Sequence, residues 1–249
     1  MEAVKNNVAV VAGATDEIGS AICRRLASKG ARVVVMDTDP QKVEALVAEL
    51  AKGDAQAMGA TIDPTHPDEI RAMIADVADK LGTIDILVNN FDHCDENPLD
   101  DVSTEGWQTA FDRNVDPVFF LTREILPGMR ARNYGRVINI GSLSYIGLPG
   151  LSSYAAAKSS LFGLTRALAL ESAKDGVTVN CVAKGDIATA DMTDAQIDNL
   201  IKAIPVRRIG KPEDVAKAVG FFASQRSPYV TGQTFFACGG KSIHFSMSI

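Results

Sequence analysis

The chain has 249 residues, of which 22% are charged and 46% hydrophobic, an ordinary balance for a globular protein with a sizeable core. Its 25 basic and 31 acidic residues give a net charge of −6, without a basic run, which argues against nucleic-acid binding. The absence of an apolar segment of about 18 residues and of a signal-peptide pattern predicts a cytoplasmic protein that does not enter a membrane.

Short apolar runs alternate with helical patterns along the whole chain. The apolar runs predict strands at Val8–Ala12, Val33–Met36, Gln56–Ile62, Ile84–Val88, Arg136–Ile140, Thr178–Val182 and Gln233–Ala237. Helical spacing predicts helices at Ile18–Ser28, Pro40–Lys52, Pro67–Leu81, Trp107–Arg132, Ser153–Ser172, Ala195–Ala203 and Pro212–Ala223. Pro117 and Pro127 are expected to kink or end parts of the long fourth helix. Strands without polar alternation, joined by helices, predict a parallel sheet covered on both faces, in one α/β domain spanning residues 1–249.

The turn Gly13–Gly19 lies between the first predicted strand and the first predicted helix. Glycines there let a pyrophosphate approach a helix N-terminus, where free N–H groups favour anions. Asp37, at the end of the second strand, is placed to accept hydrogen bonds from an adenosine ribose diol, and its charge favours NAD over NADP. The turn also carries Asp16 and Glu17, whose carboxylates oppose a pyrophosphate unless they point outward. A tight turn with an incidental acid is the alternative interpretation.

Tyr154 and Lys158 are four residues apart, so they share one face of the predicted helix. An ammonium beside a phenol favours the phenolate, which makes the pair a candidate proton donor and acceptor. Ser142 lies at the C-terminal end of the preceding strand, where open α/β sheets bind ligands. A surface Tyr–Lys pair is the alternative for this motif taken alone.

These features together resemble the short-chain dehydrogenase/reductase (SDR) family over nearly the whole chain. The resemblance is carried by Ala12–Gly19, Asp63, Asn89-Asn90, Asn114, Ser142, Tyr154–Lys158, Val179-Asn180, Lys184-Gly185 with Thr189, Thr231–Gln233 and Gly239-Gly240. It implies a Rossmann-type, doubly wound parallel sheet of about seven strands in the order 3-2-1-4-5-6-7. It also implies a homotetramer or a homodimer.

The resemblance assigns roles residue by residue. Tyr154 would be the general acid/base, Lys158 would lower its pKa, Ser142 would hydrogen-bond the substrate oxygen, and Asn114 would hold a relay water. The implied cofactor-binding residues are Gly13, Thr15, Glu17, Ile18, Gly19, Asp37, Asp63, Asn89, Asn90, Tyr154, Lys158, Gly185, Ile187 and Thr189. The implied substrate-pocket residues are His93, Ser144, Tyr145 and Met192.

The chain departs from the family pattern at several of these places. Glu17 replaces the middle glycine of the first turn, Phe91-Asp92 replaces Ala-Gly, and Lys184 replaces a proline. Ser142 stands twelve residues before Tyr154, one fewer than the family commonly has, so Ser144 is an alternative substrate contact. We hypothesise that Lys184 offsets the charge of Glu17; a solvated lysine is the alternative.

Two further stretches bear on the site. Residues 186–205 are expected to close over the substrate as an apolar lid, which favours an apolar or cyclic substrate, although an ordinary packed connector has the same pattern. The run Asp92–Glu96 is interpreted as a polar rim of the site. No metal is expected there, because adjacent residues seldom all point at one ion. The scattered cysteines predict reduced thiols, and the apolar tail Lys241–Ile249 is expected to pack across a subunit interface.

The leading prediction is therefore an NAD(H)-dependent oxidoreductase that interconverts a secondary alcohol and a ketone by hydride transfer, with a small-molecule substrate. Ring alcohols, hydroxyacyl thioesters, steroid-like substrates and 3-oxoacyl carriers all remain open. The alternative is an SDR-like chain that has lost or weakened catalysis and serves as a binding or regulatory subunit. Glu17, Asp92 and Lys184 favour that alternative, whereas the presence of all four catalytic residue types opposes it.

Overall fold

The computed structural model describes residues 4–53 and 55–244. These residues form a seven-stranded sheet in the order β3-β2-β1-β4-β5-β6-β7, and every neighbouring pair is parallel, which confirms the predicted topology. The strands are β1 (Val8–Ala12), β2 (Arg32–Asp37), β3 (Ala57–Thr61), β4 (Ile84–Asn89), β5 (Gly135–Ser142), β6 (Val177–Lys184) and β7 (Thr234–Ala237).

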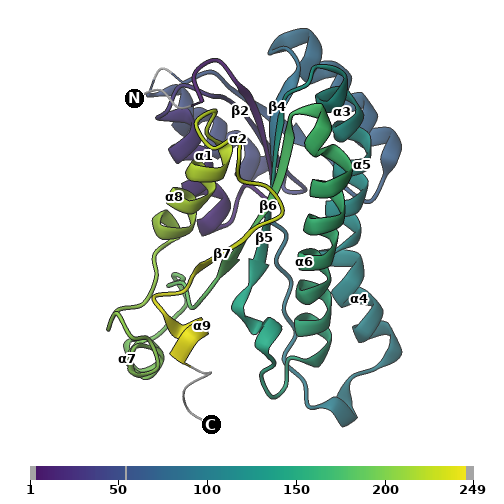
Figure 1. The fold of residues 1–249 in the computed structure, drawn as a ribbon. Helices are drawn as coiled ribbons and strands as arrows, with labels where there is room; N and C mark the ends of the chain where they lie inside the picture. The colour runs from purple at the N-terminus through teal and green to yellow at the C-terminus, as the bar shows by residue number, and fades with distance from the viewer. Residues whose placement is uncertain (1–3, 54, 245–249) are drawn as a thin grey trace.

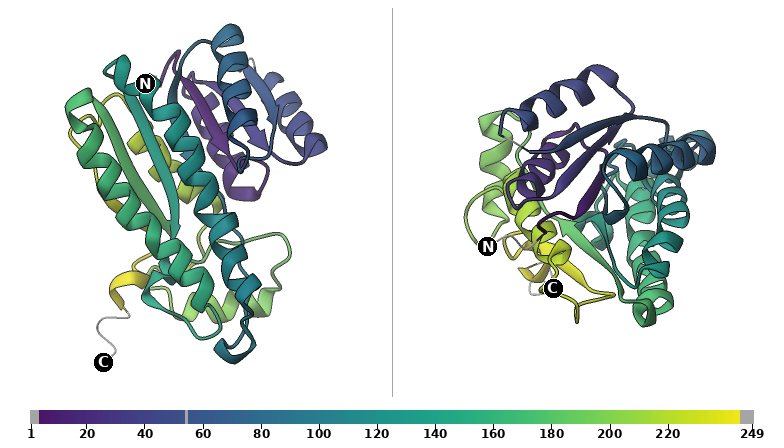
Figure 2. Two further views of the ribbon diagram at one scale, coloured as in Figure 1. Left: turned by 90° about the vertical axis from the view of Figure 1, so that its right-hand side faces the viewer. Right: turned by 90° about the horizontal axis from the view of Figure 1, so that it is seen from above.

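Helices cover both faces of this sheet (Figures 1 and 2). The helices α1 (Glu17–Ala27), α2 (Pro40–Ala51) and α8 (Pro212–Ala223) lie on one face, and α3 (Pro67–Lys80), α4 (Thr104–Asn114), α5 (Asp116–Ala131) and α6 (Ser152–Ser172) lie on the other. The shorter elements are α7 (Asp194–Lys202), α9 (Lys241–His244) and the 3-10 turns Leu99–Asp101, Leu143–Ile146 and Ala173–Asp175. Each face has its own buried apolar cluster, because β1, β2 and β4 send alternate side chains to opposite sides.

The long helix predicted over 107–132 is two helices in the structure. The chain breaks at Val115, and Pro117 occupies the first turn of α5, where its missing N–H costs no helical hydrogen bond. Pro127 stays inside α5 and does not end it. The break matters for the site because it leaves Asn114 as the last residue of α4, next to the sheet edge.

The parallel register brings the carboxyl ends of β1, β4, β5 and β6 to one edge of the sheet. Ala12 pairs with Asn89, Asn89 pairs with Asn139, and Ser142 pairs with Lys184. The order reverses between β1 and β4, which is where doubly wound sheets bind their ligands. The residues singled out from the sequence therefore gather at this edge.

Other predictions concern bulk properties of the chain. Cys23 and Cys181 are buried, and all four cysteines are unpaired, as expected for reduced thiols. Among the described residues, none of the helices has the length and apolar character needed to cross a membrane. Of the apolar tail, residues 245–249 lie outside the described part of the chain.

Candidate active site

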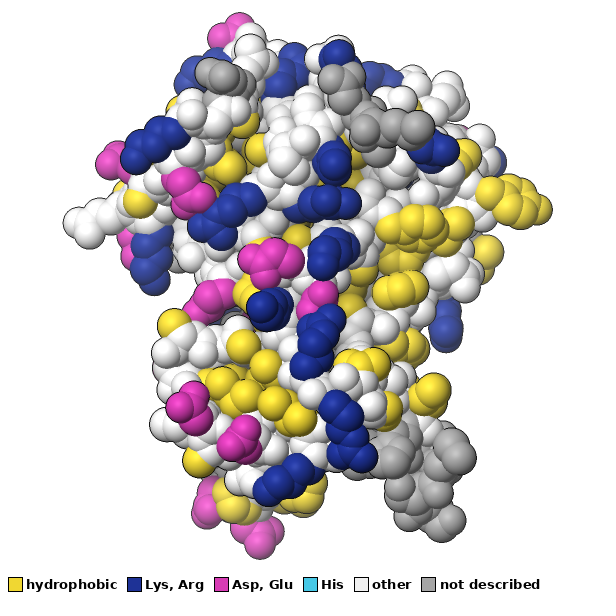
Figure 3. Space-filling model, turned by 90° about the vertical axis from the view of Figure 1, so that its left-hand side faces the viewer, with side chains coloured by type: hydrophobic (Ala, Val, Ile, Leu, Met, Phe, Trp, Pro, Cys, Tyr) yellow, Lys and Arg dark blue, Asp and Glu magenta, His cyan; other side chains and the backbone are white. Residues whose placement is uncertain are grey.

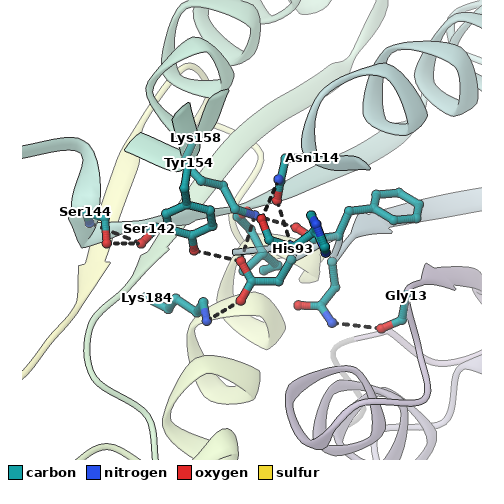
Figure 4. Close-up of polar contacts among 12 residues, drawn as sticks. Gly13, His93, Asn114, Ser142, Ser144, Tyr154, Lys158 and Lys184 are labelled. Atoms are coloured by element: carbon teal, nitrogen blue, oxygen red, sulfur yellow. Dashed lines mark hydrogen bonds and ion pairs between the residues drawn. The ribbon is translucent and has the colours of Figure 1, made fainter. Parts of the chain in front are cut away.

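Four side chains predicted to be catalytic converge at the carboxyl edge of the sheet (Figure 4). Tyr154 and Lys158 both project from the first turns of α6, Ser142 ends β5, and Asn114 ends α4. The Lys158 side chain is completely buried and Tyr154 is only 4% exposed. The surface alternative for the Tyr–Lys pair is therefore wrong.

Asp92, just beyond β4, is the hub of this cluster. The Tyr154 hydroxyl donates a hydrogen bond of 2.7 Å to Asp92 Oδ1. Lys184 Nζ, at the end of β6, lies 2.6 Å from Asp92 Oδ2, and Lys158 Nζ lies 3.3 Å from Oδ1. With the side chain only 23% exposed, one carboxylate thus contacts the phenol and both ammonium groups of the site.

The backbone around Asp92 is held by the same cluster. Lys158 donates a short hydrogen bond to the carbonyl oxygen of Phe91. The Asn114 amide accepts from His93 N at 3.0 Å and donates to His93 O at 2.8 Å. Tyr154, Lys158 and Asn114 therefore all bind residues 91–93, so three of the four predicted catalytic side chains fix the segment that carries Asp92.

The electrostatics follow from this geometry. Burial alone would raise the pKa of Asp92, but the adjacent Lys158 and Lys184 ammonium groups hold it well below its usual value. Burial and the negative charge of Asp92 raise the pKa of Tyr154 far above the ordinary value. Burial lowers the pKa of Lys158, whereas contact with Asp92 raises the pKa of Lys184 despite its burial. Tyr154 is therefore held as a neutral hydrogen-bond donor to a carboxylate.

Lys184 forms a different ion pair from the one that the sequence suggested. We hypothesised that it offsets Glu17, but its ammonium is paired with Asp92 at 2.6 Å. Glu17 instead reaches across to the segment after β6, where its Oε1 accepts a long hydrogen bond of 3.4 Å from Ala190 N. Lys184 ends β6 and Asp92 follows β4, so both lie at the carboxyl edge of the sheet, whereas Glu17 begins α1.

Ser142 and Ser144 contact each other. The Ser142 hydroxyl donates to Ser144 Oγ at 3.1 Å and accepts from Ser144 N at 3.1 Å. Both line a small cavity of about 40 Å³ together with Lys184 and Gly185. Tyr145 packs edge-on against Phe162, with ring centroids 5.0 Å apart. Among the described residues, neither Tyr145 nor Met192 lines this cavity.

A larger cavity of about 640 Å³ lies on the other side of Asp92. Of the predicted cofactor and substrate residues, it is lined by Gly13, Thr15, Asp37, Asp63, Asn90 and His93. Within the described chain, the lining includes neither Glu17, Ile18, Gly19 nor Tyr154, Lys158, Gly185, Ile187 or Thr189. Asn89 is also absent from it, because its buried amide donates to Asn139 at 2.9 Å inside the fold.

The glycine and the acidic residue of the first turn have separate structural roles. Gly13 has φ +69°, and a Cβ there would fall 2.0 Å from the carbonyl oxygen of Asn90, so only glycine fits. Asn90 donates to Gly13 O at 2.8 Å and to Asp16 Oδ1 at 3.0 Å. Asp16 caps α1 by accepting from Gly19 N at 2.6 Å. The chain's own carboxylate thus occupies the N-terminus of α1.

Asp37 is also engaged within the chain. Its Oδ2 accepts from Thr15 N at 2.9 Å and from Thr15 Oγ1 at 2.7 Å, while Oδ1 accepts from Thr38 N. A carboxylate has further lone pairs, so these bonds leave acceptor capacity toward the cavity. Asp63 similarly accepts from Thr65. Among the described residues, no cluster of three or more His, Cys, Asp or Glu is arranged to hold a metal ion.

The fold and the residues at its carboxyl edge define a Rossmann-type oxidoreductase scaffold. A family profile described as Enoyl-(Acyl carrier protein) reductase matches residues 13–242. The chain belongs to the short-chain dehydrogenase/reductase family, whose members use NAD(P).

Three known proteins illustrate the similarity. The chain is 44% identical to the (2S)-[(R)-hydroxy(phenyl)methyl]succinyl-CoA dehydrogenase subunit BbsC of Thauera aromatica, with 97% of each chain covered. It is 34% identical to subunit BbsD of the same dehydrogenase, over 96% of this chain and 98% of that one. A putative gluconate dehydrogenase from Agrobacterium tumefaciens superposes with a TM-score of 0.92 at 30% identity, over 97% of this chain and 98% of that chain.

We use the term dinucleotide groove for the carboxyl edge of the sheet from Asp37 past Asp92 to Ser142. The side chains along it do not fit a dinucleotide over its whole length. Asp37 and Asp63 line the larger cavity at its β2–β3 end. At the other end, Asp92 itself binds Tyr154 and Lys158. Asp16 and Glu17 add two carboxylates at the start of α1, where an anion needs N–H donors.

Sequence reasoning did not identify Asp92 as the hub, although a signal was present. Asp92 and Lys184 are two departures of opposite charge from the family pattern. Asp92 follows β4 and Lys184 ends β6, and these two strands end at the same edge of the sheet. An acid and a base that replace uncharged residues at such positions are candidates for a mutual ion pair.

Proposed function

We propose that this chain is a subunit of an SDR dehydrogenase for a hydroxyacyl thioester, and that hydride transfer takes place in a homologous partner subunit. The observation that carries the proposal is the Asp92 carboxylate, which contacts Tyr154, Lys158 and Lys184. The proposal keeps the chain within its family of oxidoreductases but gives its own Tyr–Lys pair a structural role.

The chemistry of the pair supports this assignment. A general base for alcohol oxidation needs a pKa near the working pH. Burial and the charge of Asp92 instead raise the pKa of Tyr154. A negative charge at hydrogen-bond distance also opposes formation of a phenolate. Tyr154 is thus a poor base as long as Asp92 holds it.

The substrate class and the assembly rest on the relatives. The names of two similar chains describe subunits of one dehydrogenase for a CoA thioester that carries a hydroxyl and a phenyl group. A thioester with an apolar ring suits the sequence expectation of an apolar or cyclic substrate.

The surface supports association with other chains. Phe221 of α8 and Phe235 of β7 are each 51% exposed, and β7 is an edge strand. Figure 3 shows apolar side chains beside a band of Lys and Arg on the side of the molecule that carries α1 and α8. Exposed aromatic side chains next to charged ones are typical of subunit interfaces. A homotetramer or homodimer of this chain is the alternative assembly.

A second candidate function is the NAD(H)-dependent oxidation of a secondary alcohol by this chain itself. Tyr154, Lys158, Ser142 and Asn114 gather in one cluster, and the cavity of about 640 Å³ extends from Asp37 to Asp92. In this case Asp92 would rotate away, Tyr154 would act as the general acid/base, and Asp37 would favour NAD over NADP.

Turnover by the isolated chain separates the two candidates. The purified chain is assayed with acetoacetyl-CoA and NADH or NADPH, and in reverse with 3-hydroxybutyryl-CoA and NAD or NADP. We expect no turnover above background in either direction. Turnover that the Tyr154→Phe variant abolishes would contradict the proposal and establish the second candidate. If the proposal is right, native mass spectrometry of the protein from its source organism should show a second, homologous SDR chain in the same complex.

A further inference from the structure

We propose that the dinucleotide groove of this chain is closed by its own carboxylates, and that Asp92 and Glu17 are the residues that exclude the cofactor. This inference rests on the proposed function and names the residues behind it. It follows because the dinucleotide used by the family needs hydrogen-bond donors, and in this chain carboxylates of the chain itself occupy several of them.

Asp92 divides the groove. The larger cavity is lined by Asp92 but not by Lys184, and the small cavity is lined by Lys184 but not by Asp92. The described lining residues of the two cavities do not overlap. The 2.6 Å ion pair between the two side chains therefore forms the partition. Ser142 lies on one side of it, and Asp37 lies on the other.

Several donors at the carboxyl edge of the sheet are already bonded to carboxylates of the chain. Tyr154 and Lys158 bind Asp92, Gly19 N binds Asp16, and Ala190 N binds Glu17. Of the residues in these contacts, Asp16 and Asp92 line the larger cavity. Glu17 lies outside that lining and bridges the start of α1 to the segment after β6. A cofactor would need to break these hydrogen bonds and displace the carboxylates. The displaced groups would lose more than water could restore, because the site is partly buried.

Charge acts in the same direction. The larger cavity is lined by the carboxylates of Asp16, Asp37, Asp63, Asp92 and Asp112, and by the cations Lys42 and Arg113. Each carboxylate near a pyrophosphate adds repulsion that costs affinity. The groove therefore selects against any anionic dinucleotide, whether or not it carries the additional phosphate of NADP.

The removal of two carboxylates should reopen the groove. We would titrate NADH and NADPH by fluorescence into the wild type and into the variants Asp92→Gly, Glu17→Gly and the double variant. The wild type should show no saturable binding up to about 1 mM, which corresponds to less than about 4 kcal/mol of binding free energy. Each single variant should show saturable binding with a dissociation constant below about 1 mM, and the double variant should bind about tenfold more tightly than either single variant.

Asp112→Asn is the matched control. Asp112 lines the same cavity and accepts a hydrogen bond from Gln108 on its own helix, so its replacement removes a charge without releasing a groove donor. We expect this variant to gain much less affinity than the double variant, because only a charge is removed and no hydrogen-bond donor is released. Binding to the double variant that is no tighter than to Asp112→Asn would overturn the inference, as would saturable binding of either cofactor by the wild type.

The wild-type titration remains decisive if a variant fails to fold, because it needs no substitution. It also separates this inference from the proposed function. Cofactor binding without turnover by the wild type would overturn the closed groove and leave the subunit assignment standing. Turnover by the isolated wild type would overturn the subunit assignment itself.

Discussion

The Asp92→Asn substitution should destabilise the fold by leaving two cations without a counter-ion. Lys158 is completely buried, and the Lys184 side chain is 18% exposed. Removal of one partner of a buried ion pair costs about 3–5 kcal/mol. Because Asp92 is partly exposed, we expect a loss of about 2–3 kcal/mol in the free energy of unfolding at pH 7. For a chain of this length that corresponds to a fall in Tm of about 4–12 °C.

The pH dependence of this loss has a defined sign. The pKa of Asp92 is depressed in the folded state, so its stabilising contribution is present above the unfolded pKa of about 3.9 and disappears as the pH falls through the folded value. Urea denaturation of wild type and variant should therefore give a constant difference between about pH 5 and 8 that shrinks below about pH 4. Asp112→Asn serves as the control and should stay within about 0.5 kcal/mol of wild type. Equal stability of Asp92→Asn and wild type at pH 7 would refute the reasoning.

Three other predictions concern the elements that hold the site. Gly13→Ala should lower the free energy of unfolding by about 3 kcal/mol in thermal denaturation, because its Cβ would meet the Asn90 carbonyl at a positive φ. The control is Gly163→Ala, at an exposed helical position with open space around it, which should raise the free energy of unfolding by about 0.5–1 kcal/mol. Similar effects of the two changes would contradict the turn geometry. Asn114→Ala should lose about 2 kcal/mol by releasing the His93 backbone, and an unchanged midpoint in urea would show that this contact is unimportant. A change from pH 8 to pH 5 should leave the wild type unable to bind NADH, because Asp92 stays ionised throughout, whereas binding that emerges at pH 5 would show that Asp92 titrates in that range.

The sequence predicted the fold well because the fold depends on local patterns. The seven apolar runs and the glycine turn predict a parallel sheet, and the strand order 3-2-1-4-5-6-7, which the family resemblance implied, was confirmed. The break at Val115 was not placed, since Pro117 and Pro127 carry the same local signal. Only the surrounding packing decides which proline begins a helix and which stays inside one.

The site was predicted less completely, because its main contacts join residues far apart in the sequence. Tyr154 and Lys158 share a helix, so their spacing located both of them. Asp92 meets Tyr154 from 62 positions away, and the path of residues 91–93 depends on the Asn114 clamp at the end of another helix. The pairing of Lys184 with Asp92 rather than Glu17 depends on the same path.

The central claim is that Asp92 holds Tyr154 as a neutral donor, and the ionisation of Tyr154 tests it most directly. The measurement is a pH titration of the phenolate absorbance, taken as the difference between wild type and Tyr154→Phe. We predict that Tyr154 does not ionise below about pH 10, the ordinary value for tyrosine. Phenolate formation by Tyr154 near neutral pH would contradict this account and identify a tyrosine prepared for proton transfer.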